Sequence, residues 1–241
     1  MSKFGKWLGG GLGWAFGGPI GAIIGFAIGS VIDDTKVVTN ATGVMPQTKQ
    51  GDFTSSLLVL CAAVMRADGT VLKVEIEFVK AFFVRHFGVE HTKQQMLVLR
   101  EILKQSIPLQ DVCLQIKQYM DYNSRVQLLH ILFGIAAADG KVDKSELDTI
   151  ATISSLLGIS EPDYTSIKAM FIRNTESDYQ ILETTASATD EEVKKAYRKM
   201  AVKFHPDKVA HLGEDYKIDA EEKFKKVQEA YDNIKKQRGI N

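Results

Sequence analysis

Apolar residues recur along most of this chain at the three-to-four-residue spacing of amphipathic helices. The pattern divides the chain into a hydrophobic, glycine-rich segment (1–34), a polar linker (35–50), a helical region (51–173) and a C-terminal helical module (177–241). We therefore predict an all-α protein. It should contain a helical bundle with an internal repeat, a C-terminal helical hairpin and an N-terminal glycine zipper.

The C-terminal module contains a strongly amphipathic helix. Thr189 followed by Glu192 is a capping-box pattern, which predicts a helix from Thr189 to Phe204. One face of this helix is apolar and the opposite face is basic. The apolar positions are Val193, Ala196, Tyr197, Met200, Ala201 and Phe204, and the basic positions are Lys194, Lys195, Arg198, Lys199 and Lys203.

The tripeptide His205-Pro206-Asp207 follows this helix directly. Pro206 bars continuation of the helix and disfavours helical backbone at His205, so a rigid loop is expected at the end of the basic face. The next helix carries apolar residues on one side, which predicts an antiparallel helical hairpin. These residues are Phe224, Val227, Tyr231 and Ile234.

This order of elements, with Glu229-Ala230-Tyr231 on the last helix, resembles the J-domain of the DnaJ family over roughly Ser177 to Ile240. The resemblance implies a co-chaperone that recruits a DnaK-type chaperone and stimulates its ATPase. It implies that His205, Pro206 and Asp207 signal to the partner. The docking face would comprise Lys194, Lys195, Arg198, Lys199 and Lys203, because a row of cations attracts an acidic surface.

Charge and cysteine content narrow the function. A basic face can also bind nucleic-acid phosphates, but 30 basic residues balance 30 acidic ones, so we expect no nucleic-acid partner. Cys61 and Cys113 are the only cysteines, which excludes a cysteine-rich zinc module and favours buried thiols in a reducing compartment. We expect no Gly/Phe-rich linker after the module. We expect an adaptor that is not an enzyme and uses no cofactor.

The middle of the chain repeats itself. Residues Leu57–Ile76 match Leu128–Leu147, and each copy has an apolar helix, an Ala-Asp-Gly turn and a helix that opens with a glutamate. The repeat predicts two pseudo-symmetric helical hairpins. Further helices are expected over 93–105, 109–122 and 163–172, with a break near Pro108.

The Ala-Asp-Gly element resembles the second half of an EF-hand loop. In both copies, however, the leading ligand positions are occupied by residues without carboxylates: Val64 and Arg66, then Ile135 and Ala137. A turn in which glycine adopts positive φ and aspartate bonds the backbone is the favoured interpretation. The alternative is one metal shared by Asp68, Glu75, Asp139 and Glu146 if the copies face each other.

The repeat followed by the C-terminal module resembles the TerB-like domain of DjlA-type co-chaperones. This resemblance implies an accessory, partner-binding domain without established catalysis. The alternative function is a metal-sensing or stress-adaptor protein in which the J-domain is accessory.

The N-terminal segment carries no charge from Trp7 to Ile32, a length sufficient for a bilayer-crossing helix. Glycine recurs every fourth residue from Gly13 to Gly29, the small-xxx-small pattern of close helix packing in membranes. Pro19 is expected to kink the segment or to split it into a short hairpin. A soluble, self-packing zipper is the alternative.

The zipper predicts membrane association. The resemblance to DjlA-type co-chaperones implies the inner membrane, with the J-domain in the cytoplasm, where it would meet its partner. Lys3 and Lys6 before the segment and Lys36 and Lys49 after it barely decide the orientation. A soluble cytoplasmic protein is the alternative. The glycine face also allows a homo-oligomer.

Overall fold

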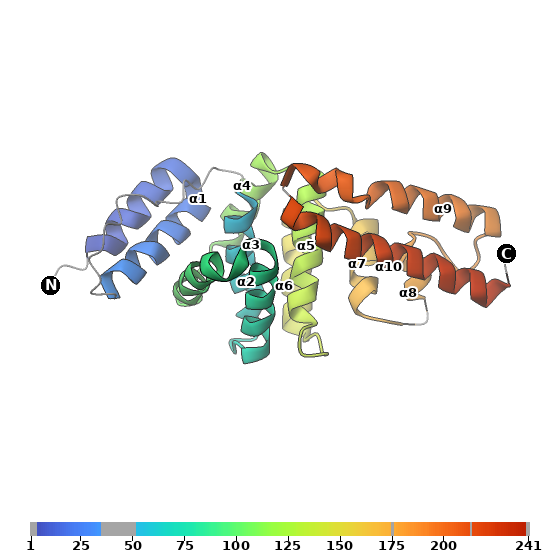
Figure 1. Cartoon of the computed structure of the whole chain (residues 1–241), viewed down its shortest axis with the longest axis horizontal. Helices are drawn as coiled ribbons and strands as arrows, with labels where there is room; N and C mark the ends of the chain where they lie inside the picture. Colours follow the sequence, from blue (N-terminus) through green and yellow to red (C-terminus); the bar gives the residue numbers. More distant parts are fainter. Residues whose placement is uncertain (1–3, 35–51, 175, 213, 240–241) are drawn as a thin grey trace. The chain divides into compact units, whose positions relative to one another are not determined.

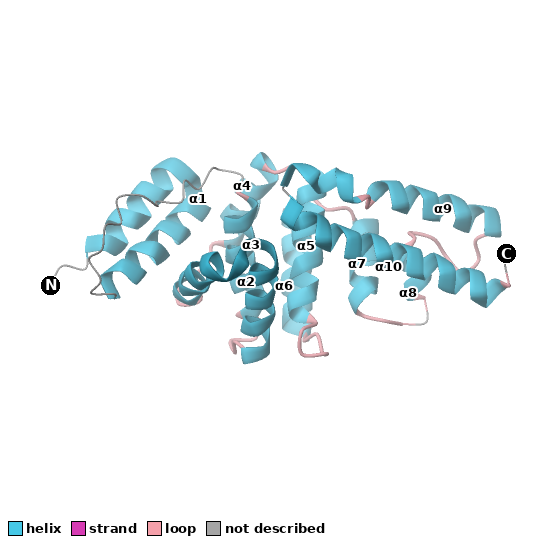
Figure 2. Ribbon diagram, in the orientation of Figure 1, coloured by secondary structure: helices cyan, strands magenta, loops and turns pink. Residues whose placement is uncertain are grey.

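The computed structural model describes residues 4–34, 52–174, 176–212 and 214–239. The predicted linker 35–50 lies outside the described residues, as do Gly213 and both chain termini. Within the described part all regular structure is helical, which confirms the predicted all-α class (Figure 2). The helices form two compact units, residues 1–121 and 122–241, so each copy of the repeat belongs to a different unit.

The first unit contains α1 (Phe4–Asp34), α2 (Phe53–Met65), α3 (Lys73–Ile102) and α4 (Leu109–Tyr119). The second unit contains α5 (Tyr122–Ala136), α6 (Lys144–Leu156), α7 (Glu161–Phe171), α8 (Ser177–Ile181), α9 (Asp190–Lys203), the 3-10 helix η1 (Pro206–Leu212) and α10 (Glu214–Arg238) (Figure 1).

The glycine-rich segment α1 is two helices that fold back on each other (Figure 1). Gly18 has φ 62°, which reverses the chain, and Pro19 opens the second helix, where a missing N–H costs nothing. The split expected at Pro19 is confirmed. In the part of the chain that the structure describes, no helix combines the length and apolar character needed to span a membrane.

Glycine allows the two halves of this hairpin to approach closely. A Cβ added at Gly13 would collide with the carbonyl oxygen of Gly21, and one at Gly9 would collide with that of Gly25. The zipper predicted from the glycine spacing is therefore used within one chain. These four glycines pack against each other and do not present a free face in this structure.

The hairpin packs on α3 and α4 of the same unit. Ile20, Ile23, Ile24 and Ala27 are buried there. Gln115 of α4 binds both sides of the reversal, because its Oε1 accepts from Ile20 N at 3.0 Å and its Nε2 donates to Gly17 O at 2.8 Å. The glutamine thereby satisfies backbone groups that the break in the helix leaves without partners.

The two copies of the repeat have the same turn geometry. Gly69 and Gly140 have φ 85° and 86°. Asp68 Oδ1 accepts from Thr70 N at 2.8 Å, and Asp139 Oδ1 accepts from Lys141 N at 2.8 Å. The predicted turn, with positive φ at glycine and an aspartate bonded to the backbone, is confirmed in both copies.

The boundaries of the three further helices differ from those predicted, and α7 begins at Glu161 instead of residue 163. The helix expected over 93–105 is the second part of α3, which is kinked at Gly88 (φ 75°) and ends at Ile102. The helix expected over 109–122 ends at Tyr119, because Met120 is extended (φ −118°, ψ 133°). Tyr122 instead begins α5, where its hydroxyl donates to Asp163 Oδ2 at 2.5 Å.

The predicted hairpin of the C-terminal module is formed by α9 and α10 (Figure 1). The Tyr197 and Tyr231 rings stack across it with centroids 4.3 Å apart. Thr189 and Glu192 form the predicted capping box, with Glu192 N donating to Thr189 Oγ1 at 3.3 Å and Thr189 N donating to Glu192 Oε2 at 2.8 Å.

A buried polar seam joins α5 to this hairpin. Lys223 of α10 is 3% exposed, and its Nζ donates to Gln127 Oε1 of α5 at 2.8 Å. Burial lowers the pKa of Lys223 to about 7, although Asp163 and Asp219 act in the opposite direction. Burial, together with the charges of Lys223 and Lys226, holds the pKa of His130 well below 6.5. Lys223 and His130 therefore bind protons less readily than exposed lysine and histidine side chains do.

The close packing of the α1 hairpin predicts that alanine substitutions at two glycines of one helix change its stability in opposite directions. Gly13→Ala should destabilise α1, because the added Cβ meets the backbone at Gly21, and overpacking costs about 1–3 kcal/mol. Gly11→Ala should stabilise α1 by about 0.5–1 kcal/mol, because the added Cβ would point into open space and alanine is the better helix former. Hydrogen exchange of the α1 amides should quicken in the first variant and slow in the second. Equal effects would contradict close packing at Gly13.

The seam generates a pH prediction. Because the folded pKa of Lys223 is about 7 and its ordinary value is 10.5, the unfolded chain binds the extra proton between these pH values. The free energy of unfolding should therefore rise with pH across this window. Lys223→Met should remove this part of the rise and stabilise most near pH 6, where the folded protein must otherwise bury the charge.

Denaturant unfolding at pH 6, 7, 8 and 9 measures the effect. Lys225→Met removes an exposed neighbouring lysine and should preserve the wild-type slope. A Lys223→Met protein with the wild-type slope would contradict the assignment.

Candidate functional site

The HPD site (His205, Pro206 and Asp207) lies where α9 ends and η1 begins. Phe204 caps α9 with φ −101° and is 3% exposed, so it anchors the segment from which the site projects. The predicted stop before His205 is confirmed. Pro206 and Asp207, expected in a loop, open η1 instead, because the fixed φ of proline suits the first position of a helix. Lys208 N donates to His205 O at 2.9 Å and closes the turn.

The two polar side chains of the HPD site face solvent. The side chain of His205 is 52% exposed and that of Asp207 is 80% exposed. Asp207 N donates to His205 Nδ1 at 3.3 Å, and the His205 ring meets Phe224 of α10 edge-on with centroids 5.9 Å apart. His205 Nδ1 also lies 3.5 Å from Asp207 Oδ2. This arrangement holds an imidazole and a carboxylate side by side at the surface, where a partner can reach both.

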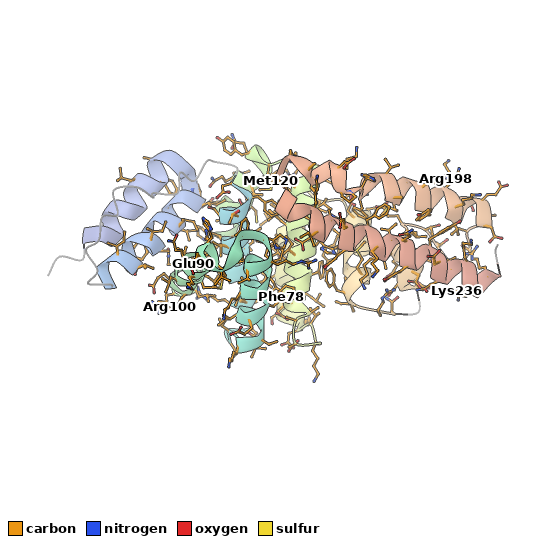
Figure 3. The ribbon with its side chains drawn as sticks, in the orientation of Figure 1. Phe78, Glu90, Arg100, Met120, Arg198 and Lys236 are labelled. Atoms are coloured by element: carbon orange, nitrogen blue, oxygen red, sulfur yellow. The ribbon has the colours of Figure 1, made fainter. Side chains whose placement is uncertain are left out.

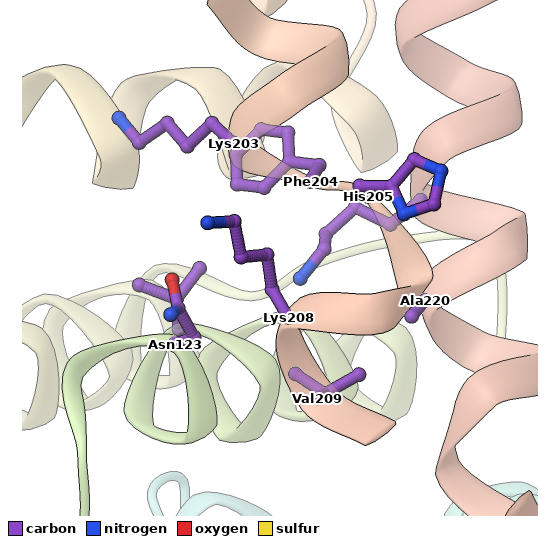
Figure 4. Close-up of a pocket in the computed structure, with 9 residues that line it drawn as sticks. Asn123, Lys203, Phe204, His205, Lys208, Val209 and Ala220 are labelled. Atoms are coloured by element: carbon purple, nitrogen blue, oxygen red, sulfur yellow. The ribbon is translucent and has the colours of Figure 1, made fainter. Parts of the chain in front are cut away.

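A shallow polar pocket lies behind the HPD site (Figure 4). Figure 4 shows Lys203 and His205 leaving the end of α9 in opposite directions, while Lys208 extends from η1 toward Asn123. The pocket is lined by Asn123, Val126, Lys203, Phe204, His205, Lys208, Val209, Ala220 and Lys223.

Sequence reasoning missed Asn123, Lys208 and Lys223 because they come from three separate elements. One signal was available: Lys223 stands four residues before Val227 on the apolar side of α10.

The predicted docking face divides into two parts. Lys194, Lys195 and Arg198 are exposed, and Figure 3 shows Arg198 on the outer side of α9. Lys199 Nζ lies 2.7 Å from Glu183 Oε2, yet 65% of the lysine side chain is exposed. These four cations remain accessible to a partner from outside the helix.

Lys203 is placed differently from the other four. Its Nζ lies 2.6 Å from Asp163 Oδ1 and 2.6 Å from Glu183 Oε1, and its side chain is 24% exposed. Burial acts to lower the pKa of Lys203, but the two carboxylates outweigh it and raise the pKa. The lysine therefore stays charged and is bound inside its own unit, which differs from the solvent-facing role predicted from the helical pattern.

The four candidate metal ligands have local structural partners. Glu75 Oε2 accepts from Leu72 N at 2.7 Å, and Glu146 Oε2 accepts from Asp143 N at 2.9 Å, so both glutamates cap their own helices. Asp68 and Asp139 bind their own turns. Across the described ranges there is no group of three or more His, Cys, Asp or Glu side chains arranged to hold a metal ion.

Both cysteines are free and buried. Burial raises the pKa of Cys61 far above its ordinary value and raises that of Cys113 to about 12. Both therefore stay protonated near neutral pH, as expected for structural thiols.

Three protein-family models match the chain in sequence order. The Co-chaperone DjlA transmembrane domain matches residues 1–47, Tellurite resistance protein TerB matches residues 54–169, and the DnaJ domain matches residues 177–239. The HPD site and the basic face fall in the third match. The repeat falls in the second.

Known relatives agree with this order. A co-chaperone protein DjlA from Photobacterium profundum is 28% identical over 224 residues, which cover 80% of either chain, and one from Vibrio vulnificus is 28% identical over 232 residues. A chaperone protein DnaJ from Fusobacterium nucleatum is 51% identical over 63 residues, but this chain spans only 16% of that relative's length. A search of solved structures returns no match. The chain thus carries matches to the DjlA transmembrane, TerB and DnaJ domains in that order, and it is similar to DjlA co-chaperones over 80% of its length.

Proposed function

We propose that this DnaJ-type co-chaperone recruits a DnaK-type chaperone through its HPD site and basic face, and stimulates the ATPase of that partner. The observation that carries the proposal is the solvent exposure of His205 and Asp207 at the end of a cationic helix. The DjlA and DnaJ names of the relatives support the same partner class.

The geometry suits docking followed by signalling. Lys194, Lys195 and Arg198 are exposed along α9 and attract an acidic partner surface, which raises the association rate and orients the partner. His205 and Asp207 then reach the partner from a backbone anchored by buried Phe204. The chain itself carries out no bond chemistry in this proposal, since its part is to change the rate of hydrolysis in another protein.

Single-turnover ATP hydrolysis by the DnaK-type chaperone, with the 241-residue chain added, tests the proposal. With His205→Gln or Asp207→Asn, the rate of ATP hydrolysis should stay close to the rate of the chaperone alone. Both side chains are exposed, so the variants should fold as wild type. Asp232→Asn removes an exposed carboxylate of α10 and should stimulate normally. A well-folded Asp207→Asn protein with full stimulation would overturn the site assignment.

We further place the chain at the inner membrane, with the J-domain in the cytoplasm and the glycine-rich segment as its anchor. The match of residues 1–47 to the DjlA transmembrane domain and the absence of charge from Trp7 to Ile32 support this location. The chain should sediment with inner membranes and resist alkaline extraction, while added protease should reach the J-domain only after cells are opened. Recovery of the intact chain in the soluble fraction would contradict the anchor.

A further inference from the structure

One buried carboxylate of the TerB region (residues 54–169) contacts the segment that carries the HPD site. Asp163 of α7 is 1% exposed. Its Oδ2 accepts from Tyr122 Oη of α5 at 2.5 Å and from Ser160 Oγ at 2.8 Å. Its Oδ1 lies 2.6 Å from Nζ of Lys203, the last residue of α9. Three helices of one unit therefore meet at a single side chain.

Helix capping alone does not explain this burial. Ser160 is the N-cap of α7, and an acidic residue in the first turn stabilises a helix from the surface, as the exposed Glu161 does. Asp163 instead reaches a cation 40 positions along the chain and is removed from water. A carboxylate buried in this way requires a paired charge and hydrogen-bond donors, which Lys203, Tyr122 and Ser160 provide.

A second carboxylate holds the same lysine. Glu183 Oε1 lies 2.6 Å from Lys203 Nζ. The backbone of Glu183 has φ 54°, a conformation that residues other than glycine adopt rarely. The surrounding contacts must therefore hold Glu183 in place, and its carboxylate also binds Lys199 at 2.7 Å. Lys203 is consequently fixed between the TerB region and the start of the J-domain.

The opposite side of the same turn is also fixed. Phe204 is buried, and Nζ of Lys223 lies 4.9 Å from its ring centroid while it donates to Gln127 of α5. Further along η1, Ser124 Oγ and His211 Nε2 are 3.0 Å apart. The chain entering and leaving the HPD site is thus bound to the TerB region, whereas the side chains of His205 and Asp207 stay exposed.

We propose that Asp163 is a positioning residue for the HPD site: by holding Lys203, it sets the direction in which the J-domain presents His205 and Asp207. The TerB region would then be part of the signalling device, beyond any role in localisation. The exposure of the HPD site favours positioning over inhibition, because the contact leaves the site uncovered. This inference rests on the proposed function.

The experiment compares Asp163→Asn with Glu161→Gln in the 241-residue chain. Each variant neutralises one acid in the first turn of α7, so effects on that helix are matched, but only the first removes the partner of Lys203. Stimulated ATP hydrolysis is measured over a range of co-chaperone concentrations. Maximal stimulation should fall roughly three- to tenfold in Asp163→Asn, the scale on which residues coupling two sites act. The half-maximal concentration and the Glu161→Gln protein should not change.

Two further variants show that the readouts are separable. Arg198→Gln removes a docking charge and should raise the half-maximal concentration, while His205→Gln should abolish stimulation. Hydrogen exchange of the amides at 204–210 should quicken in Asp163→Asn and not in Glu161→Gln. A general loss of structure would instead quicken exchange throughout the unit.

Each outcome decides the proposal. Wild-type maximal stimulation and exchange in folded Asp163→Asn would overturn it. If that variant does not fold, Tyr122→Phe, which removes one hydrogen bond to the same carboxylate, replaces it under the same criteria. If the wild-type chain gives no stimulation, the proposed function fails. The exchange comparison then decides the positioning role by itself.

Discussion

The ion pair between Asp163 and Lys203 lies where α5, α7 and α9 meet, largely out of water. Charges removed from water are costly, and their attraction compensates only when the remaining hydrogen-bonding groups are also satisfied. Here Tyr122 and Ser160 donate to the carboxylate, and Glu183 shares the ammonium group. Removing one member of such a pair costs about 3–5 kcal/mol, so the arrangement of α9 against the TerB region depends on it.

This constraint gives the end of α9 a defined direction while the HPD site remains in solvent. Phe204 and Lys203 are held, and His205 and Asp207 project beyond them. A fixed backbone at Lys203 and Phe204 with exposed side chains at His205 and Asp207 suits recognition, because the backbone then loses little conformational freedom on binding. The exposed cations of α9 add long-range attraction, which acts mainly on the rate of encounter.

In the first unit, the helices of the α1 hairpin are held by close backbone packing, whereas in the second unit α7 and α9 are held by an ion pair. Gly9 and Gly13 meet Gly25 and Gly21 without intervening side chains. Gln115 satisfies the backbone groups of the reversal, and Ser30 Oγ donates to Glu101 Oε2 at 2.9 Å. Burial raises the pKa of Glu101, but hydrogen bonds from Lys104 and Ser30 and the charges of Lys104 and Arg100 lower it overall. An otherwise apolar hairpin is thus held by a few directional polar contacts.

Features that depend only on neighbouring residues could be predicted from the amino-acid sequence. The Thr189 cap, the stop before Pro206, the two Ala-Asp-Gly turns and the split at Pro19 are local properties of backbone and side chain, and all were predicted. The order of the domains followed from motifs that are equally local.

Which polar residues face inward could not be predicted in this way, because it depends on how the helices pack. Helical spacing groups Lys203 with four solvent-facing cations. It does not show that Asp163 of α7 and Glu183 after α8 lie beside Lys203 in the folded protein. Helical spacing likewise does not show that Lys223 is buried against Gln127. The glycine spacing fits packing within one chain as well as packing between chains. These choices depend on contacts between residues far apart in the sequence, where burial and charge pairing are settled only when the helices meet.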